Sequence, residues 1–207
     1  MEELITTYLK EKYNPLAIIL YGSRASNKAN KDSDWDFVIL VENEIEVVIE
    51  MIEGQIVDLD VIKLPVSKDE LIKQFDGTLQ ISKVVFDTND IANKLLESIK
   101  EVYSKGRNLR AKELENRKNF ITRRLNKLES SLENNAMFFF HLGIFFEKAV
   151  QYWFEIKKNR WKVAPATALK IVEEEDKNYS DLLGVLYSNL SNQEKLDSAR
   201  KIISLLV

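Results

Sequence analysis

The 207-residue chain contains no cysteine and a single histidine, His141. Without cysteine the protein cannot form disulfides, thiolate zinc sites or a cysteine nucleophile, which excludes several enzyme classes. No apolar run reaches the roughly 18 residues of a membrane span, and the acidic start MEELITTYLK lacks the pattern of a signal peptide. These absences predict a cytoplasmic protein that does not enter a membrane.

The chain has no excess of positive charge, because 30 lysines and arginines stand against 33 aspartates and glutamates and the formal net charge at pH 7 is −3. A net negative charge argues against a general nucleic-acid binder, which would need a basic surface to meet phosphates. The length suffices for one large domain or two small ones, each with its own core.

The most informative stretch runs from Ile18 to Leu40, IILYGSRASNKANKDSDWDFVIL. It predicts an apolar strand, a tight turn at Gly22 and Ser23, a polar connector, and a second strand that carries Asp34 and Asp36. Residues two apart in a strand share a face, so both carboxylates point the same way. Magnesium takes oxygen ligands and leaves positions open for substrate phosphates. Two carboxylates facing a turn with backbone N–H groups therefore suit a metal–nucleotide complex.

The pattern Gly-Ser, ten residues, then Asp-x-Asp resembles the signature of the DNA polymerase beta-like nucleotidyltransferase superfamily. That group holds kanamycin and other antibiotic nucleotidyltransferases and the minimal nucleotidyltransferases. The resemblance covers residues 16–62. It implies an α/β domain with a mixed sheet and helices, which transfers a nucleoside monophosphate, AMP from ATP being expected, to a hydroxyl. A simpler interpretation is a solvated, hairpin-like connection.

The resemblance also assigns roles to residues of this chain. Two Mg²⁺ ions, or Mn²⁺ in their place, would be held by Asp34, Asp36 and a third carboxylate. The triphosphate would be held by Gly22 and Ser23, and Arg24 would add positive charge or face the solvent. The chain departs from the family where Arg24-Ala25 is followed by Ser26-Asn27 instead of x-Gly. This departure affects the connector and leaves the metal ligands in place.

A later segment, 55–64 with the sequence QIVDLDVIKL, supplies two candidates for the third carboxylate. Its residues have high β-propensity, and alternation places Asp58 and Asp60 on the same face of the predicted strand. The family carries its third carboxylate on a later strand, and Asp58 in the context Val-Asp-Leu is the closer match. Asp60 is the second choice. The alternative is an edge strand whose acidic outer face discourages aggregation.

Helical spacing predicts the elements that flank these strands. Residues 2–12 should form a helix, and Asn14-Pro15 should end it. A crossover helix is expected over residues 42–53, ending at Gly54 as its C-cap. Its apolar face would hold Ile45, Val48, Ile49 and Ile52.

Residues 67–75 should form a helix that opens with the capping box Ser67-x-x-Glu70, and residues 81–86 should form a strand. Beyond Asp90 only helical patterns occur. We therefore predict a nucleotidyltransferase α/β domain over 1–104 and an all-α helical bundle over 105–207.

The run MFFFHLGIFFEKAVQYWF, from Met137 to Phe154, is apolar nearly all round. Such a helix belongs in the centre of the bundle or at a subunit interface, which predicts a homodimer through the helical domain. Kanamycin nucleotidyltransferase-like enzymes take a glutamate from their helical part as general base. By this resemblance Glu147 is the candidate here. Its alternative role is an ordinary pair with a neighbouring lysine.

The window 105–127 holds nine lysines and arginines against two glutamates, a local balance of +7. Some of its arginines would face a substrate phosphate, whereas a solvated helix face with internal ion pairs is the alternative. The arginines considered are Arg107, Arg110, Arg117, Arg123 and Arg124.

Taken together, the sequence predicts an ATP-dependent nucleotidyltransferase whose acceptor is a hydroxyl-bearing small molecule, with antibiotics among the candidates. Three alternatives stay open: a protein-modifying AMP-transferase that acts on a partner toxin, a nucleotide-binding regulator without turnover, and an oligomerisation or scaffold protein. Neither a membrane nor a nucleic acid is expected as a partner. The residues alone do not name the acceptor.

Overall fold

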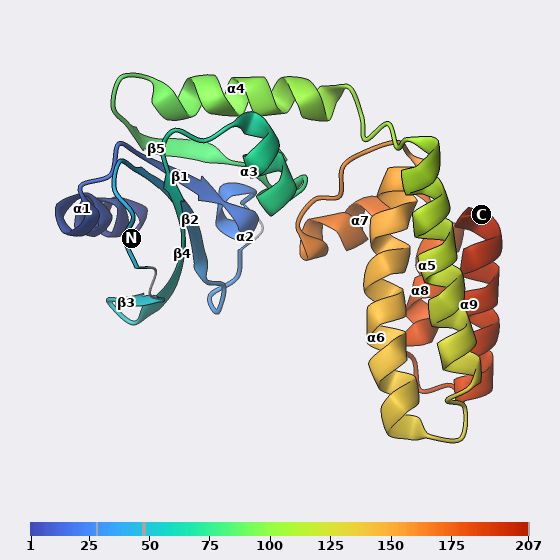
Figure 1. Ribbon diagram of the computed structural model, residues 1–207. Helices are drawn as coiled ribbons and strands as arrows, with labels where there is room; N and C mark the ends of the chain where they lie inside the picture. The colour runs from blue at the N-terminus through green and yellow to red at the C-terminus, as the bar shows by residue number, and fades with distance from the viewer. Residues whose placement is uncertain (28, 47–48, 207) are drawn as a thin grey trace. The chain divides into compact units, whose positions relative to one another are not determined.

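A computed structural model describes residues 1–27, 29–46 and 49–206 of the chain. The chain divides into two compact units, Met1–Lys105 and Gly106–Val207. The first contains all the strands of the described residues, and the second is built from helices (Figure 1). The predicted fold class, an α/β domain followed by a helical bundle, is confirmed.

The first unit is organised around a five-stranded mixed sheet in the order β3-β4-β2-β1-β5. Neighbouring strands run antiparallel except for β2 and β4, which are parallel. The strands are β1 (Ala17–Tyr21), β2 (Trp35–Val41), β3 (Glu50–Ile52), β4 (Gln55–Lys63) and β5 (Lys83–Asp87). The helices are α1 (Glu2–Tyr13), α2 (Gly22–Ala25), α3 (Lys68–Phe75), a 3₁₀ turn (Thr78–Gln80) and α4 (Ile91–Ser104).

Helix α1 covers one face of this sheet. It ends at Asn14, whose left-handed backbone (φ 44°) and following proline stop the helix. Its buried residues Ile5 and Leu9 pack in one cluster with alternate residues of the central strands. Those strand residues include Trp35 and Phe37 of β2, whose side chains stack with ring centroids 6.1 Å apart. The other set of β2 side chains, which includes Asp36, therefore faces away from α1.

The opposite face is covered at one end only. Helix α4 contacts β1 and β5, and α3 contacts α4 (Figure 1). Along β2 this face passes from buried Leu40 and Val38 to the half-buried Asp36. Along β4 it passes from the buried Ile62 to the exposed Asp58. One end of the face is thus core, and the other end, which carries the carboxylates, is open.

The crossover helix predicted over residues 42–53 is wrong. Residues 42–46 and 49 are not helical, and 50–52 form β3, which pairs with β4 as an antiparallel hairpin. Val48, on which that prediction partly depended, lies outside the described residues. The two hairpin residues Glu53 and Gly54 both have positive φ, 49° and 75°. Positive φ at both central residues is the geometry that suits a two-residue hairpin, so Gly54 serves a strand turn and not a helix end.

The second unit has helices α5 to α9, and their apolar faces meet in a single core. The bounds are α5 (Ala111–Glu129), α6 (Asn135–Tyr152), a π-helical turn (Trp153–Lys157), α7 (Pro165–Glu175), α8 (Lys177–Leu186) and α9 (Asn192–Leu206). Within the core, the carboxylate of Glu155 is almost fully buried and accepts hydrogen bonds from Arg117 (2.8 Å) and Gln151 (2.7 Å). A buried charge needs such partners because desolvation without them is expensive.

Helix α6 forms part of that core through Phe138, Leu142 and Phe145. Its first turns also expose two aromatic side chains, Phe139 and Phe140. Among the described residues, none of the helices combines the length and apolarity needed to span a bilayer.

Candidate active site

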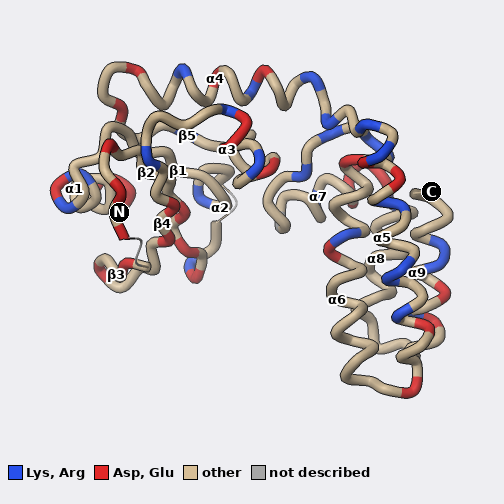
Figure 2. The backbone as a smooth tube through the Cα atoms, viewed as in Figure 1, with Lys and Arg blue, Asp and Glu red and all other residues tan. Residues whose placement is uncertain are grey.

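The carboxylates predicted from the sequence lie on two adjacent parallel strands. Asp34 directly precedes β2 and Asp36 is its second residue. In the β2–β4 register Asp36 stands beside Asp58, whereas Asp60 stands beside Val38, two residues further along. The structure therefore brings Asp34, Asp36 and Asp58 to the open end of one sheet face. Figure 2 shows acidic residues along β4 in this region.

Asp60 is held by a network of its own. The hydroxyl of Tyr21 donates a hydrogen bond to Oδ2 of Asp60 over 2.6 Å, and Nε2 of Gln74 donates to Oδ1 over 3.4 Å. Tyr21 belongs to β1 and is paired with Asp36, so its side chain reaches across β2 to β4. Its ring also meets Phe75 of α3 edge-on, with centroids 5.7 Å apart. This network ties β1, β4 and α3 together next to the other carboxylates.

Gly22 brings the turn after β1 against the carboxylate of Asp36. Its backbone has φ +73°, and a Cβ built on it would lie 2.1 Å from Oδ2 of Asp36. Any side chain here would collide with the carboxylate, and L-residues disfavour this φ as well. Gly22 and Ser23 begin the short helix α2. The first N–H groups of a helix have no acceptor within the helix, so this turn can present donors to an anion.

Arg24 is engaged with the loop that carries Asp34. Its Nε donates to the carbonyl oxygen of Asp34 over 2.9 Å, and Nη2 donates to the carbonyl oxygen of Ser33. Nη2 also donates to Oε1 of Gln55 over 3.3 Å. The guanidinium lies 4.2 Å from the ring centroid of Trp35. The planar fork of arginine thereby fixes the start of β2, and its charge stays near the carboxylates.

The electrostatics of the site centre on Asp36. Partial burial, together with the negative charges of Asp34, Asp58 and Asp60, raises the pKa of Asp36 to about 6, while Arg24 opposes the change. Burial and the hydrogen bond to Asp60 also raise the pKa of Tyr21, so its hydroxyl stays a donor. Like-charge crowding of this kind is relieved by a bound cation.

The donor set fits a magnesium ion. The side chains on the open end are carboxylates, and Mg²⁺ prefers oxygen ligands. Among the residues that the structure describes, no three histidine, cysteine, aspartate or glutamate side chains are gathered closely enough to form a metal site. Mg²⁺ is commonly held by one or two carboxylates together with waters and substrate phosphates, so a partial protein set is compatible with it.

Glu147 is not among the residues that the first unit brings together. It lies on α6 in the second unit, its side chain is 58% exposed, and its Oε1 is 3.1 Å from Nζ of Lys148. Its role as general base stays a prediction.

The arginines near the start of the second unit are paired within that unit. Arg117 binds Glu155, Arg110 binds Glu113 over 2.9 Å, and Arg107 lies 3.6 Å from Glu113. Figure 2 shows the basic residues along α5. The pair Arg110–Glu113 is of the kind expected for a solvated helix face, whereas Arg117 pairs with the buried Glu155.

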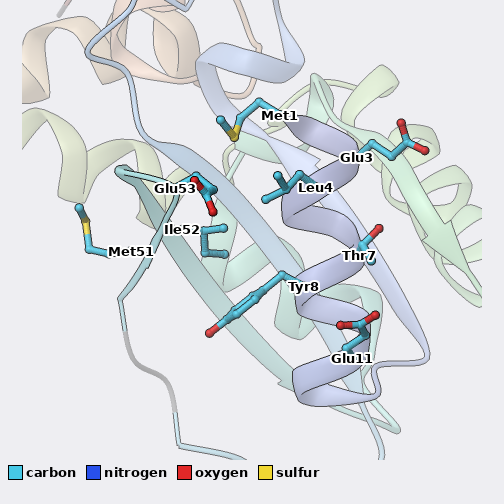
Figure 3. A pocket seen from close by; sticks show the side chains of 9 residues that line it. All are labelled: Met1, Glu3, Leu4, Thr7, Tyr8, Glu11, Met51, Ile52 and Glu53. Carbon is cyan, nitrogen blue, oxygen red and sulfur yellow. The ribbon is translucent and has the colours of Figure 1, made fainter.

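A groove of about 710 Å³ lies between α1 and β3 (Figure 3). Leu4 and Tyr8 of α1 and Ile52 of β3 are among its lining residues, and Glu3, Glu11 and Glu53 supply its acidic groups. Ile52 belongs to the cluster under α1, so this groove opens on the sheet face opposite the carboxylates. We therefore place the candidate active site at the carboxylates and not in this groove.

Sequence reasoning missed Tyr21 and Gln74. A signal for Tyr21 was available in the sequence. It shares a strand face with Ile19, and once β1 pairs with β2 it lies beside Asp36 on the same face of the sheet. Gln74 had none, since its contact depends on how α3 packs.

Comparison with known proteins agrees with this geometry. The family described as polymerase beta, nucleotidyltransferase matches residues 3–109, which is just over half of the chain. A comparison with curated proteins gave no match. Among solved structures, a nucleotidyltransferase-like protein from Exiguobacterium sibiricum 255-15 is similar, with a TM-score of 0.51 and 15% sequence identity. That alignment covers 100% of this chain and 74% of the other, and at this identity it supports the fold alone. By the family match, the chain belongs to the polymerase beta nucleotidyltransferase family.

Proposed function

We propose that the protein transfers AMP from ATP to a hydroxyl group of a small-molecule acceptor. One observation carries this proposal: Asp36 and Asp58 stand side by side on parallel strands, with Asp34 next to them and Gly22 against Asp36. This arrangement combines oxygen ligands for a divalent cation with a turn that can receive phosphate. The family match supports transfer of a nucleotide, and the acceptor and the cation are part of the proposal.

In this reaction the acceptor oxygen forms a bond to the α-phosphorus of ATP. The bond from the α-phosphorus to the oxygen that bridges to the β-phosphorus breaks, and pyrophosphate leaves with the electron pair. The hydroxyl proton passes to a base, for which Glu147 is the candidate from the family resemblance. The products are the adenylylated acceptor and pyrophosphate.

Asp34, Asp36 and Asp58 would hold two Mg²⁺ ions, or Mn²⁺, which when bound lower the pKa of the attacking hydroxyl and neutralise charge on the leaving pyrophosphate. The chain's own groups orient the reactants. The N–H groups of Gly22 and Ser23 and the Ser23 hydroxyl receive the β- and γ-phosphates. Arg24 holds the backbone of Asp34 in place and adds positive charge nearby.

The direct test is a screen for pyrophosphate release. Purified protein would be incubated with each nucleoside triphosphate, Mg²⁺ or Mn²⁺, and aminoglycosides, lincosamides or simpler hydroxyl compounds as acceptors. We expect release with ATP and an acceptor, loss of release in Asp36→Asn, and normal release in Asp32→Asn. Asp32 is a matched control because it is an exposed aspartate in the same connector. Equal activity in both variants, or equal activity with EDTA, would contradict the proposal.

A protein acceptor is the second candidate. The observation that favours it is the exposed pair Phe139 and Phe140 on α6, because exposed aromatic groups mark protein contacts. The same surface would serve the predicted homodimer. Light scattering of the wild type and of Phe139→Ser/Phe140→Ser separates these cases: a dimer that dissociates in the variant indicates self-association. If the wild type is monomeric, the exposed phenylalanines are available to bind another protein. AMP transfer to candidate proteins would then be assayed.

A further inference from the structure

Two exposed apolar side chains stand next to the carboxylates on the same face of the sheet. Met51 of β3 is 65% exposed and Ile56 of β4 is 51% exposed. They are register partners across the hairpin. Cross-strand partners have Cβ atoms roughly 5 Å apart, so the two side chains form one continuous surface, which we call the apolar ledge.

The two ledge side chains point to the carboxylate face, although Met51 also borders the groove between α1 and β3. Ile52 on β3 packs in the cluster under α1, so Met51 between it and Glu50 must point the other way. Figure 3 draws both residues at the groove, where Ile52 turns toward α1 and the Met51 side chain points away from α1. Ile56 precedes Asp58 by two residues on β4, which places their side chains on one face roughly 7 Å apart.

The order of strands determines where the ledge lies relative to the reacting groups. From β1 to β3 the face presents in turn Gly22 at the end of β1, Asp36 on β2, Asp58 on β4, and the ledge. Under the proposed function, the leaving pyrophosphate lies toward the Gly22 turn. In an in-line displacement the attacking oxygen enters opposite the leaving oxygen. The acceptor hydroxyl therefore enters over β4, and the rest of the acceptor extends toward β3.

We propose that Met51 and Ile56 form the binding surface for an apolar part of the acceptor, a proposal that rests on the proposed function. The acceptor is then an amphipathic hydroxyl compound. Its apolar group lies within roughly 10 Å, about two strand spacings, of the reacting oxygen. Methionine suits such a surface, because its flexible thioether adapts to ligands of different shape. A uniformly polar acceptor would leave the ledge exposed to water and gain nothing from it.

Alkyl glucosides are suitable probes, since each has sugar hydroxyls and the alkyl chain can be lengthened from methyl to octyl below the micelle concentration. We expect kcat/KM for pyrophosphate release to rise with chain length in the wild type. In Met51→Ser/Ile56→Ser the KM for octyl glucoside should rise at least tenfold and the dependence on chain length should vanish. Release with methyl glucoside and affinity for Mg²⁺·ATP should stay unchanged. Leu4→Ser tests the groove between α1 and β3, which both Leu4 (45% exposed) and Met51 line, and this variant should leave the dependence on chain length unchanged.

Binding can also be followed without turnover. The chain has three methionines, Met1, Met51 and Met137, so ¹³C-methyl labelling gives three signals, and Met51→Ser identifies one of them. Octyl glucoside should shift the Met51 signal in the presence of Mg²⁺·ATP and leave the other two in place. Equal shifts at all three signals, or none at Met51, would overturn the ledge. A Met51 shift without any pyrophosphate release would uphold the ledge as a binding surface and count against the proposed function.

Discussion

No side chain separates Gly22 from Asp36: a Cβ atom at position 22 would lie 2.1 Å from Oδ2 of the aspartate. The turn that is to receive phosphate and the strand that is to hold the cation are therefore in direct contact. Because opposite charges attract strongly over short distances in a partly buried site, this contact would place a triphosphate and its cation side by side. It also explains why this turn requires glycine.

Gly22→Ala should damage the site more than the fold. The φ of +73° makes alanine unfavourable by about 1 kcal/mol, and the collision with Asp36 displaces its carboxylate as well. Gly54→Ala is the matched control, since its φ is +75° but nothing lies within 4 Å of the added Cβ. Urea unfolding should show a loss of about 1 kcal/mol in the control, with unchanged affinity for Mg²⁺·ATP. Gly22→Ala should bind Mg²⁺·ATP at least tenfold more weakly than the wild type. Wild-type affinity of this variant in calorimetry would refute a role for the Gly22–Asp36 contact in nucleotide binding.

Asp36→Asn should make the free protein more stable at neutral pH. The folded-state pKa of about 6 lies above the ordinary aspartate value of about 4. At pH values between these two pKa values, the folded chain therefore binds more protons than the unfolded chain. Stability then falls as pH rises from about 4 to about 6, and the ionised carboxylate stays unfavourable above that range. With solvent screening, we expect a gain on the order of 1 kcal/mol for the variant at pH 7.5, or a few degrees in Tm.

Thermal unfolding of both proteins without divalent cations at pH 5 and pH 7.5 provides the check. The gain should shrink at pH 5, where Asp36 in the wild type is mostly protonated. Saturating Mg²⁺·ATP should reverse the order, since only the wild type retains this carboxylate for the cation. A variant that is less stable than the wild type at pH 7.5 without cations would contradict the crowding of charges at Asp36.

Local patterns were sufficient to predict the strands of the motif, the capping box at Ser67 and the succession of an α/β unit by helices. They were not sufficient for residues 42–53. Ile45, Ile49 and Ile52 have helical spacing, but the pairing of β3 with β4 and the positive φ of Gly54 determined the structure instead. Periodicity cannot decide between a short helix and a hairpin when the competing strand partner follows at once.

The site shows the same limit. Alternation placed Asp58 and Asp60 on one face, but which of them lies beside Asp36 depends on the register between β2 and β4, which no single strand encodes. The contact from Tyr21 to Asp60 joins residues 39 positions apart, and it exists because the strand order puts β2 between β1 and β4. Such contacts follow from topology and not from local sequence.

Arg24→Lys distinguishes two roles for the arginine. Lysine keeps the charge but cannot donate to the carbonyl oxygens of Ser33 and Asp34 together and lie flat on Trp35. If fixing the start of β2 is the main role, we expect kcat to fall about tenfold or more with a smaller change in affinity for ATP. Steady-state pyrophosphate release measures both constants. Full activity in the lysine variant would assign Arg24 to charge alone.

Asp58→Asn should abolish transfer, whereas Asp60→Asn should leave most of it. Asp58 stands beside Asp36, while Asp60 is two residues further along and already accepts hydrogen bonds from Tyr21 and Gln74. That offset is roughly 7 Å, so the Asp60 carboxylate lies farther from Asp36 than that of Asp58, the direct neighbour on the adjacent strand. The asparagine at position 60 keeps an oxygen that can accept from Tyr21.

Tyr21→Phe completes the test, because it removes the hydroxyl that holds Asp60 and keeps the ring against Phe75. A hydrogen bond to a charged acceptor contributes about 1.5 to 3 kcal/mol, so the free energy of unfolding of this variant, measured in urea, should fall. Its rate of AMP transfer should be similar to that of Asp60→Asn. Rates of pyrophosphate release for the three variants, each at saturating Mg²⁺, give the comparison. An inactive Asp60→Asn beside an active Asp58→Asn would exchange their roles: Asp60 would then bind the cation, and Tyr21 would orient that ligand.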